Sequence, residues 1–317
     1  MHILVTGGAG FVGSHLIDFL LADGHSVVCI DDLSLGKPEN IAHFEDSDGF
    51  EFRKLDILNK DDFGDIFKKN RFDCVFHMAA NSDIQLGGQF LNVDFERTFL
   101  TTYTVLESMK EHGIKDIVFA STSAIYGELS GKLSEVSGPL CPVSFYGAAK
   151  LASEGYISAA CTNFSMRAWV VRFPNVIGER TTHGVIYDFI NKLQNNPKEL
   201  IILGNGQQEK PYLYVKDLVQ TILFVWKNMK ENFNCCNVSV DSASKVTRIA
   251  EIVVEEMGLK DVKFNYTGGD RGWVGDVPKF EYDISKLKAL GWKSLRSSDD
   301  AVRLAVREEL KLRGIGR

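Results

Sequence analysis

The chain of 317 residues lacks the sequence patterns of metal, redox and membrane proteins. Its six cysteines are scattered, and it contains neither Cys-x-x-Cys nor His-x-x-x-His, so zinc binding and thiol redox chemistry are not expected. The adjacent pair Cys235 and Cys236 is interpreted as incidental. Every apolar run is shorter than the about 20 residues that cross a bilayer, and no basic start or apolar signal core follows Met1. We therefore expect no metal, no membrane partner and a reducing, cytoplasmic location.

Positive charge is also scarce. The chain has 36 Lys and Arg against 42 Asp and Glu, a net charge of −6, and no long basic run. Such a chain is not expected to bind nucleic acid or anionic membranes in general. Apolar residues make up 44% and charged residues 25%, which is ordinary for a globular protein and excludes a disordered chain, a collagen-like repeat and a disulfide-stapled miniprotein.

In the first half of the chain, short apolar runs alternate with segments of helical periodicity. Strands are expected near residues 3–6, 26–31, 72–77, 116–120 and 168–172, and helices of roughly 20 residues near 92–112 and 143–161. Buried strands separated by helices predict a parallel sheet with right-handed crossovers. The second half is less regular, and no linker or repeat separates it. We expect a smaller C-terminal lobe that is interleaved with the first domain.

A glycine-rich turn joins the first expected strand to the first expected helix. Gly7, Gly10 and Gly13 form G-x-x-G-x-x-G, one residue longer than the G-x-G-x-x-G dinucleotide turn. Glycine lets backbone N–H groups approach a pyrophosphate, and the helix N-terminus adds partial positive charge. Asp31 ends the second strand and suits the ribose hydroxyls of an adenosine, which favours NAD over NADP. The sequence therefore predicts an α/β fold of the Rossmann type, a doubly wound parallel sheet that binds NAD.

Tyr146 and Lys150 are four residues apart, a spacing that places both on one face of a helix. A cation beside a phenol lowers the phenol's pKa from about 10, which would make Tyr146 a usable acid and base near neutrality. Ser121, Thr122 and Ser123 follow an expected strand at the carboxyl edge of the sheet, where such folds bind ligands.

On these residues the sequence resembles an extended short-chain dehydrogenase/reductase of the NAD-dependent nucleotide-sugar epimerase/dehydratase family. The resemblance covers nearly the whole chain. Its matching segments are residues 6–13, 31–34, 55–57, 77–80, 121–122, 146–150, 172–178, 204–206, 214–217, 269–271 and 283–286.

The resemblance implies a role for individual residues. Tyr146 is the catalytic acid/base at the C4 hydroxyl, Thr122 shares its hydrogen bond, and Lys150 holds the nicotinamide ribose. The implied cofactor residues are Gly7, Gly10, Phe11, Val12, Gly13, Asp31, Asp32, Leu33, Ser34, Asp56, Ile57, Met78, Ala79, Ala80, Ala120, Ser121, Tyr146, Lys150 and Phe173. The implied substrate residues are Thr122, Asn175, Val185, Leu203, Lys210 and Arg271, with Arg271 and Lys210 at the diphosphate.

The sequence also predicts how the chain divides into domains. Residues 1–173 form the NAD-binding domain, with 213–240 returning to it, and residues 174–212 and 241–317 form the substrate-binding lobe. His183 and Trp273 lie in the expected substrate region. Either one could contact ligand, although a solvated histidine and a tryptophan covering the core are the simpler interpretations.

Where many relatives carry Thr-Asp-Glu for dehydration, this chain has Thr122, Ser123 and Ala124. The favoured function is therefore an NAD-dependent nucleotide-sugar 4-epimerase that acts through a transient 4-keto intermediate, on a substrate of the UDP-glucose/galactose type. The alternatives are a nucleotide-sugar C4 dehydrogenase or reductase with net turnover, and a protein that keeps NAD as a structural or sensing ligand. The resemblance also implies a homodimer built from the helices near residues 92–112 and 143–164, with Tyr103, Leu106, Ala152 and Tyr156 toward the partner.

Overall fold

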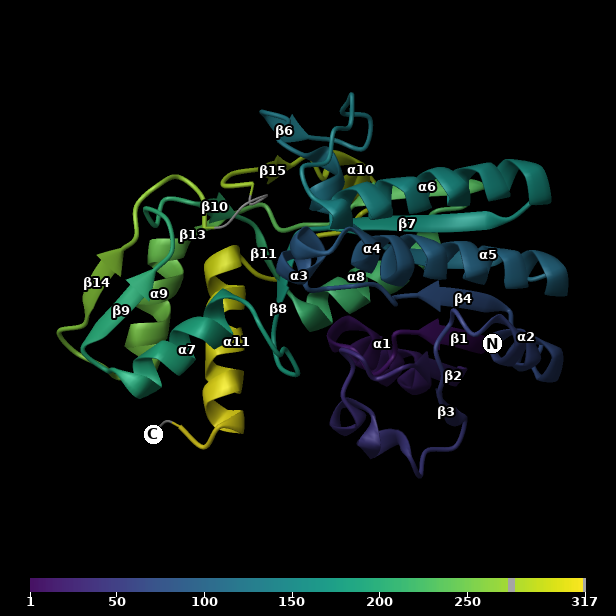
Figure 1. Cartoon of the computed structure of the whole chain (residues 1–317), viewed down its shortest axis with the longest axis horizontal. Helices are drawn as coiled ribbons and strands as arrows, with labels where there is room; N and C mark the ends of the chain where they lie inside the picture. Colours follow the sequence, from purple (N-terminus) through teal and green to yellow (C-terminus); the bar gives the residue numbers. More distant parts are fainter. Residues whose placement is uncertain (273–276, 316–317) are drawn as a thin grey trace. The chain divides into compact units, whose positions relative to one another are not determined.

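The structure is a computed structural model that describes residues 1–272 and 277–315. The chain forms two compact units, each assembled from separate stretches of sequence; Figure 1 labels their elements. The first unit comprises Met1–Glu128, Gly138–Arg172 and Val219–Cys236, and the second comprises Leu129–Ser137, Phe173–Leu218 and Asn237–Arg317. Residues 129–137 were expected in the first domain. They belong to the second unit because β6 (Lys132–Leu133) pairs there with β15 (Glu281–Tyr282).

The first unit is built on a seven-stranded sheet with the order β12-β7-β5-β4-β1-β2-β3. Strand β1 pairs in parallel with both β2 and β4, and the pairs β2–β3 and β4–β5 are also parallel. The expected doubly wound α/β fold is confirmed. The strands are β1 (His2–Thr6), β2 (Ser26–Asp31), β3 (Phe50–Lys54), β4 (Cys74–His77), β5 (Asp116–Thr122), β7 (Arg167–Phe173) and β12 (Phe233–Asn237).

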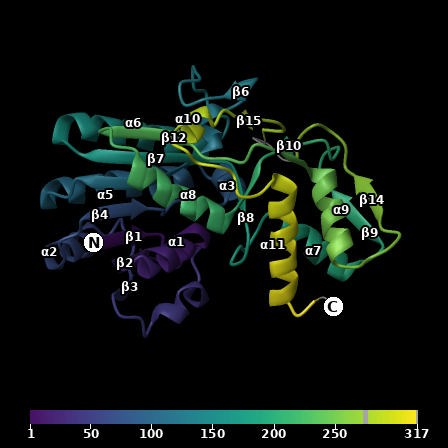
Figure 2. The same cartoon turned by 180° about the vertical axis from the view of Figure 1, so that it is seen from behind.

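Both faces of this sheet are covered by helices. On one face, α2 (Lys60–Lys69), α5 (Thr101–His112) and α6 (Phe145–Phe164) pack buried apolar side chains onto the strands in one continuous core. On the other face, α1 (Phe11–Ala22) buries Leu16, Ile17 and Leu20. Trp226 from α8 (Val215–Asn228) packs against Phe76 of β4, with the two ring centres 5.1 Å apart. Figure 2 shows α1 and α8 from this side. Burial on both faces explains the uninterrupted apolar runs of the strands.

The helix expected near residues 92–112 is formed by three consecutive segments. These are α4 (Leu91–Asp94), a π-helical segment η3 (Phe95–Leu100) and α5, which ends at Gly113 with a φ of 73°. Leu106 was expected at a dimer surface, and this is wrong: Leu106 is 7% exposed and lies in the core. The short elements α3 (Ile84–Gln89), η1 (Pro38–Asn40), η2 (Ala42–Phe44) and η4 (Ser123–Tyr126) connect the larger ones.

The second unit contains small sheets and helices packed on one another. Strands pair as β8 with β11, β9 with β14, and β10 with β13. Helices α7, α9 and α11 bury apolar faces that include Phe189, Ile252 and Val302. The elements are β8 (Asn175–Ile177), α7 (Val185–Asn195), β9 (Glu199–Ile202), β10 (Glu209–Lys210), β11 (Tyr212–Tyr214), β13 (Ser244–Lys245), α9 (Val246–Glu256), β14 (Lys263–Tyr266), α10 (Ser285–Ala289) and α11 (Ser298–Leu312).

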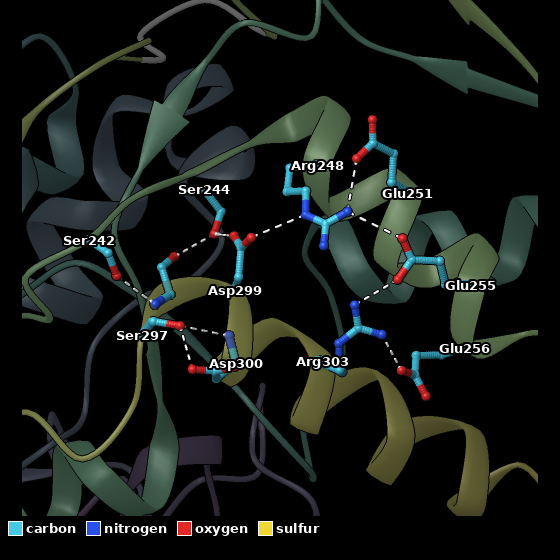
Figure 3. Close-up of polar contacts among 11 residues, drawn as sticks. Ser242, Ser244, Arg248, Glu251, Glu255, Glu256, Ser297, Asp299, Asp300 and Arg303 are labelled. Atoms are coloured by element: carbon cyan, nitrogen blue, oxygen red, sulfur yellow. Dashed lines mark hydrogen bonds and ion pairs between the residues drawn. The ribbon is translucent and has the colours of Figure 1, made fainter.

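A network of ion pairs joins α9 to α11 (Figure 3). Arg248 pairs with Glu255 on its own helix at 3.2 Å and with Asp299 at 3.1 Å, and Arg303 pairs with Glu255 at 2.6 Å. An isolated exposed ion pair stabilises a fold by only about 0–1 kcal/mol, so no single pair here is expected to contribute much to stability. Several pairs that share residues fix the two helices against each other. Ser297 accepts a hydrogen bond from the Asp300 N–H and caps α11. Among the described residues, no helix is both long and apolar enough to cross a membrane.

Candidate functional site

The glycine turn packs tightly between β1, α1 and the residues that follow β4. Gly7 has a φ of 69°, and a Cβ there would lie 2.6 Å from the backbone nitrogen of Ala79. A Cβ on Gly13 would lie 2.2 Å from the Gly7 carbonyl oxygen. Both positions therefore require glycine. Helix α1 starts after Gly10, which offers no side-chain cap, and its first turn carries no acidic residue. Its first residues Phe11 and Val12 thus present an N-terminus that suits an anion.

Asp31 closes this turn from the end of β2. Its Oδ2 accepts a hydrogen bond from the Ala9 N–H at 3.0 Å, and its Oδ1 accepts one from the Leu33 N–H at 2.9 Å. Burial raises the pKa of the Asp31 carboxyl, against the lowering effect of these N–H donors. Asp32 accepts from the Ser34 N–H at 2.9 Å, which shapes the loop beyond it. Asp31 therefore organises the glycine turn as well as occupying the position predicted for ribose binding.

The other predicted cofactor residues lie at the same carboxyl edge of the sheet. Met78, Ala79 and Ala80 directly follow β4, and the Met78 N–H donates to the Thr6 carbonyl at 3.1 Å. After β3, Asp56 is exposed and accepts a hydrogen bond from the Leu58 N–H at 2.9 Å, while Ile57 packs into the core. Because parallel strands end at one edge, these segments are close to the turn. Their contacts with a cofactor remain predictions.

The predicted catalytic residues come from two elements of the first unit. Ser144 caps α6 by accepting the Gly147 N–H at 3.1 Å, and the helix carries Tyr146 and Lys150 toward the end of β5. The Lys150 ammonium donates to the Ala120 carbonyl at 2.6 Å. Thr122 accepts the Ala124 N–H at 3.1 Å. The structure thus brings Ala120, Ser121 and Thr122 against the helix face that carries Tyr146 and Lys150.

The predicted lowering of the Tyr146 pKa by Lys150 is wrong for this structure. Burial raises the pKa of Tyr146 to about 12, although a hydrogen bond with Thr122 lowers it. Burial also lowers the pKa of Lys150 to about 7, although Glu154 and Asp94 raise it. The Lys150 Nζ is 5.9 Å from the Tyr146 ring centre, a position from which a protonated lysine favours the phenolate. Burial therefore disfavours the charged form of both residues of the pair.

The predicted substrate residues all lie in the second unit, apart from Thr122. Phe173, predicted at the nicotinamide, is the last residue of β7 and the first of this unit. Lys210 is 8% exposed. The remaining positions are Asn175 at the start of β8, Val185 at the start of α7, Leu203 after β9 and Arg271 on an exposed loop. His183 is exposed beside Thr182, and Trp273 lies outside the described residues.

Three buried ionisable residues near the catalytic pair were not predicted. Glu154 and Arg172 form a buried ion pair at 2.6 Å, and Asp94 is 1% exposed and accepts a hydrogen bond from Asn81 at 3.0 Å. The sequence held a signal for one of them, because Glu154 continues the four-residue spacing of Tyr146 and Lys150. Arg172 and Asp94 carry no such local signal, since their contacts depend on β7 and α4 packing against α6.

Comparison with known proteins now decides the family. A model described as the NAD dependent epimerase/dehydratase family matches residues 3–236. The chain belongs to this family. NAD is therefore the cofactor of the enzyme, and the fit is physical: the uncapped N-terminus of α1 and the glycines at 7 and 13 provide the close, positive backbone that a pyrophosphate needs.

Individual relatives agree with the family assignment. The UDP-glucose 4-epimerase of Mycolicibacterium smegmatis is 32% identical over 70% of this chain and 72% of its own length. A UDP-galactose 4-epimerase crystal structure is 37% identical, with a TM-score of 0.86 over 98% of this chain and 99% of that chain. The Thermotoga maritima UDP-glucose 4-epimerase with UDP-glucose is 30% identical, with a TM-score of 0.89 over 98% and 99% of the two chains. The resemblance that the motifs indicated is confirmed.

Proposed function

We propose that the protein is a nucleotide-sugar 4-epimerase that acts on substrates of the UDP-glucose/galactose type through a transient 4-keto sugar. One observation carries the choice of reaction. The end of β5 places Thr122 at the face of α6 that holds Tyr146 and Lys150, and the next two residues are Ser123 and Ala124. Neither of these is a carboxylic acid, so the segment has no acid/base pair with which to expel water from the sugar.

The residues of this chain perform the proton transfer in the proposed reaction. Bound NAD would supply the hydride chemistry at C4. Tyr146 removes the proton from the C4 hydroxyl and returns it when the hydroxyl re-forms, so no proton is gained or lost overall. Thr122 shares the hydrogen bond to that oxygen. A protonated Lys150 would place a positive charge on the same helix face as Tyr146, which opposes the effect of burial on the phenol.

The substrate end is proposed from the family resemblance. Asn175, Val185 and Leu203 would contact the nucleotide sugar, while Arg271 and Lys210 would hold its diphosphate. An arginine presents a planar fork that matches phosphate oxygens, and a lysine adds a point charge.

Epimerisation is tested with purified protein and several nucleotide sugars. UDP-glucose, UDP-N-acetylglucosamine, and CDP- and GDP-sugars are incubated separately, and each product is examined for the C4 isomer by NMR. We expect the isomer from UDP-glucose without added oxidant. A free keto product, or turnover that requires added NAD in stoichiometric amounts, would indicate net C4 oxidation or reduction instead. No isomer from any of these sugars would reject the proposal.

We also propose a homodimer in the cytoplasm. Aromatic side chains are exposed on the surface formed by α4, η3 and α6. Phe95 is 55% exposed and Tyr156 is 51% exposed. The ring centres of Phe99 and Tyr156 are 5.1 Å apart. A second copy of the chain that pairs the same helices would cover them. None of the six cysteines, which all lie in the described part of the chain, forms a disulfide, and five of them are buried, as suits a reducing compartment.

A further inference from the structure

Helix α6 contacts the end of β5 through three residues at successive turns. Tyr146 forms a hydrogen bond with Thr122, Lys150 donates to the carbonyl of the residue at position 120 at 2.6 Å, and Glu154 accepts the Ser121 hydroxyl at 2.5 Å. Three consecutive residues of the strand are therefore each held by one residue of the helix. Two of these contacts are made by residues already assigned to catalysis, and the third is made by Glu154.

Glu154 is itself fixed in place by an arginine from the next strand. The Arg172 Nη2 donates to Oε2 of Glu154 at 2.6 Å, and the Arg172 Nε donates to Oε1 at 3.0 Å. A third donor, the Arg172 Nη1, reaches the Tyr126 hydroxyl at 2.9 Å. Glu154 is 5% exposed and Arg172 is 6% exposed. A bidentate pair buried in this way holds the carboxylate in one position.

This carboxylate lies one helical turn beyond Lys150, in an environment that disfavours a charged lysine. Burial lowers the pKa of Lys150 to about 7. The Phe119 ring, whose centre lies 4.5 Å from the Lys150 Nζ, acts in the opposite direction, because an aromatic face attracts a cation. The charged or titratable groups that face Lys150 are Asp94 from α4, His77 from β4, and Tyr146 and Glu154 from α6. Of these, the two carboxylates favour the ammonium form.

We propose that Glu154 is a positioning residue of the epimerase site, which keeps the Lys150 ammonium charged and holds the Ala120–Thr122 segment in register with Tyr146. Arg172 orients this carboxylate. The inference rests on the proposed function for its catalytic consequence, because a neutral Lys150 cannot favour the Tyr146 phenolate. Its electrostatic part concerns the protein alone and is testable without substrate.

The direct test is a pH titration of Lys150 by NMR on protein labelled with ¹³C and ¹⁵N at lysine. The Lys150→Arg variant identifies the Lys150 signal by its loss. In Glu154→Gln we expect Lys150 to titrate about one pH unit or more below wild type, since an opposite charge nearby shifts a pKa by about 1–3 units. Asp116→Asn is the matched control. Asp116 at the start of β5 forms an ion pair with Arg167 at the start of β7, at 2.5 Å, so the variant removes a paired carboxylate at the other end of these strands. The control should titrate as wild type does.

Kinetics supply the second measurement. In Glu154→Gln, kcat should fall and its alkaline limb should move to lower pH, while KM stays unchanged, because Lys150 loses its proton earlier. Glu154→Asp keeps the charge but shortens the reach to Ser121, so kcat should fall with the alkaline limb in place. Neither pattern is expected from a residue that only stabilises the fold.

If the loss of the Glu154 charge beside Arg172 prevents Glu154→Gln from folding, the double variant Glu154→Gln/Arg172→Gln carries the same test. A Lys150 titration unchanged in the folded variant would overturn the proposal. So would an equal lowering in Asp116→Asn. Wild-type protein that produces no C4 isomer would reject the proposed function instead, and the NMR titration would still decide whether Glu154 controls the charge of Lys150.

Discussion

His77 offers a sharp test of how burial links protonation to the stability of this fold. It is the last residue of β4 and is fully buried. Its Nε2 lies 3.0 Å from the Thr102 hydroxyl, which already donates to the Thr98 carbonyl, so Nε2 carries the proton. Its Nδ1 lies 2.7 Å from the Thr6 Oγ1 and accepts a hydrogen bond from the Thr6 hydroxyl. The neutral ring satisfies both contacts, and a second ring proton would break one of them.

The size of the effect follows from the pKa. Burial, with a smaller contribution from the charge of Lys150, lowers the pKa of His77 from 6.5 to about 3. Because the folded pKa is lower than the unfolded one, the unfolded chain binds the proton first as pH falls. The contribution of neutral His77 to the free energy of unfolding is therefore present above pH 6.5 and is lost progressively as the pH falls to about 3. At 1.36 kcal/mol per pH unit, the loss between pH 7 and pH 5 is about 2 kcal/mol.

The assay is urea unfolding of wild type and His77→Gln at pH 7, 6 and 5. Glutamine keeps one donor and one acceptor but does not titrate in this range. The variant will be less stable at every pH, so the informative quantity is the change of unfolding free energy with pH. We expect wild type to lose about 2 kcal/mol more than the variant by pH 5. His183→Gln, at an exposed position, should follow wild type. Parallel pH profiles for wild type and His77→Gln would refute the reasoning.

Three further predictions address the site and the assembly. Tyr146→Phe should lower kcat about 10²–10⁴-fold while circular dichroism and bound NAD stay unchanged; turnover near wild type would reject Tyr146 as the acid/base. Arg271→Ala should raise KM strongly, because a contact with the substrate diphosphate is made in the ground and transition states alike. The NAD content of the purified protein should stay unaltered. Loss of NAD with KM unchanged would move the diphosphate site elsewhere. Wild type should have a dimeric mass by light scattering at micromolar concentration and Tyr156→Glu a monomeric one, whereas a monomeric wild type would contradict the dimer.

Several features of the site were readable from the chain because local spacing encodes them. The glycines at 7 and 13 are required by the turn between β1 and α1, and the acid at position 31 follows the next strand. Tyr146 and Lys150 share a helix face at their separation in any helix. The alternation of apolar runs with helical periodicity led to the doubly wound sheet, since strands buried on both faces must be apolar throughout.

Other features depended on elements that are distant in sequence. The pairing of β6 with β15 joins residues 132–133 to residues 281–282, and it moves residues 129–137 out of the first unit. The π-helical segment after Asp94 adds residues to a turn, so the periodicity of an α-helix misplaces the side chains around it. Leu106 packs into the core, whereas the sequence predicted it at a dimer surface. Helical spacing alone does not tell which neighbour an apolar position faces.

The protonation of the catalytic pair shows most clearly where the sequence stops and the tertiary structure decides. The sequence determined that a tyrosine and a lysine share one helix face. It did not determine that burial lowers the pKa of Lys150 to about 7, or that Glu154 and Arg172 form an ion pair in the same unit. Spacing along one helix is local geometry that the chain carries with it. Desolvation and the pairing of charges from different strands arise only when the whole unit packs, because both depend on what surrounds a side chain and not on its neighbours in sequence.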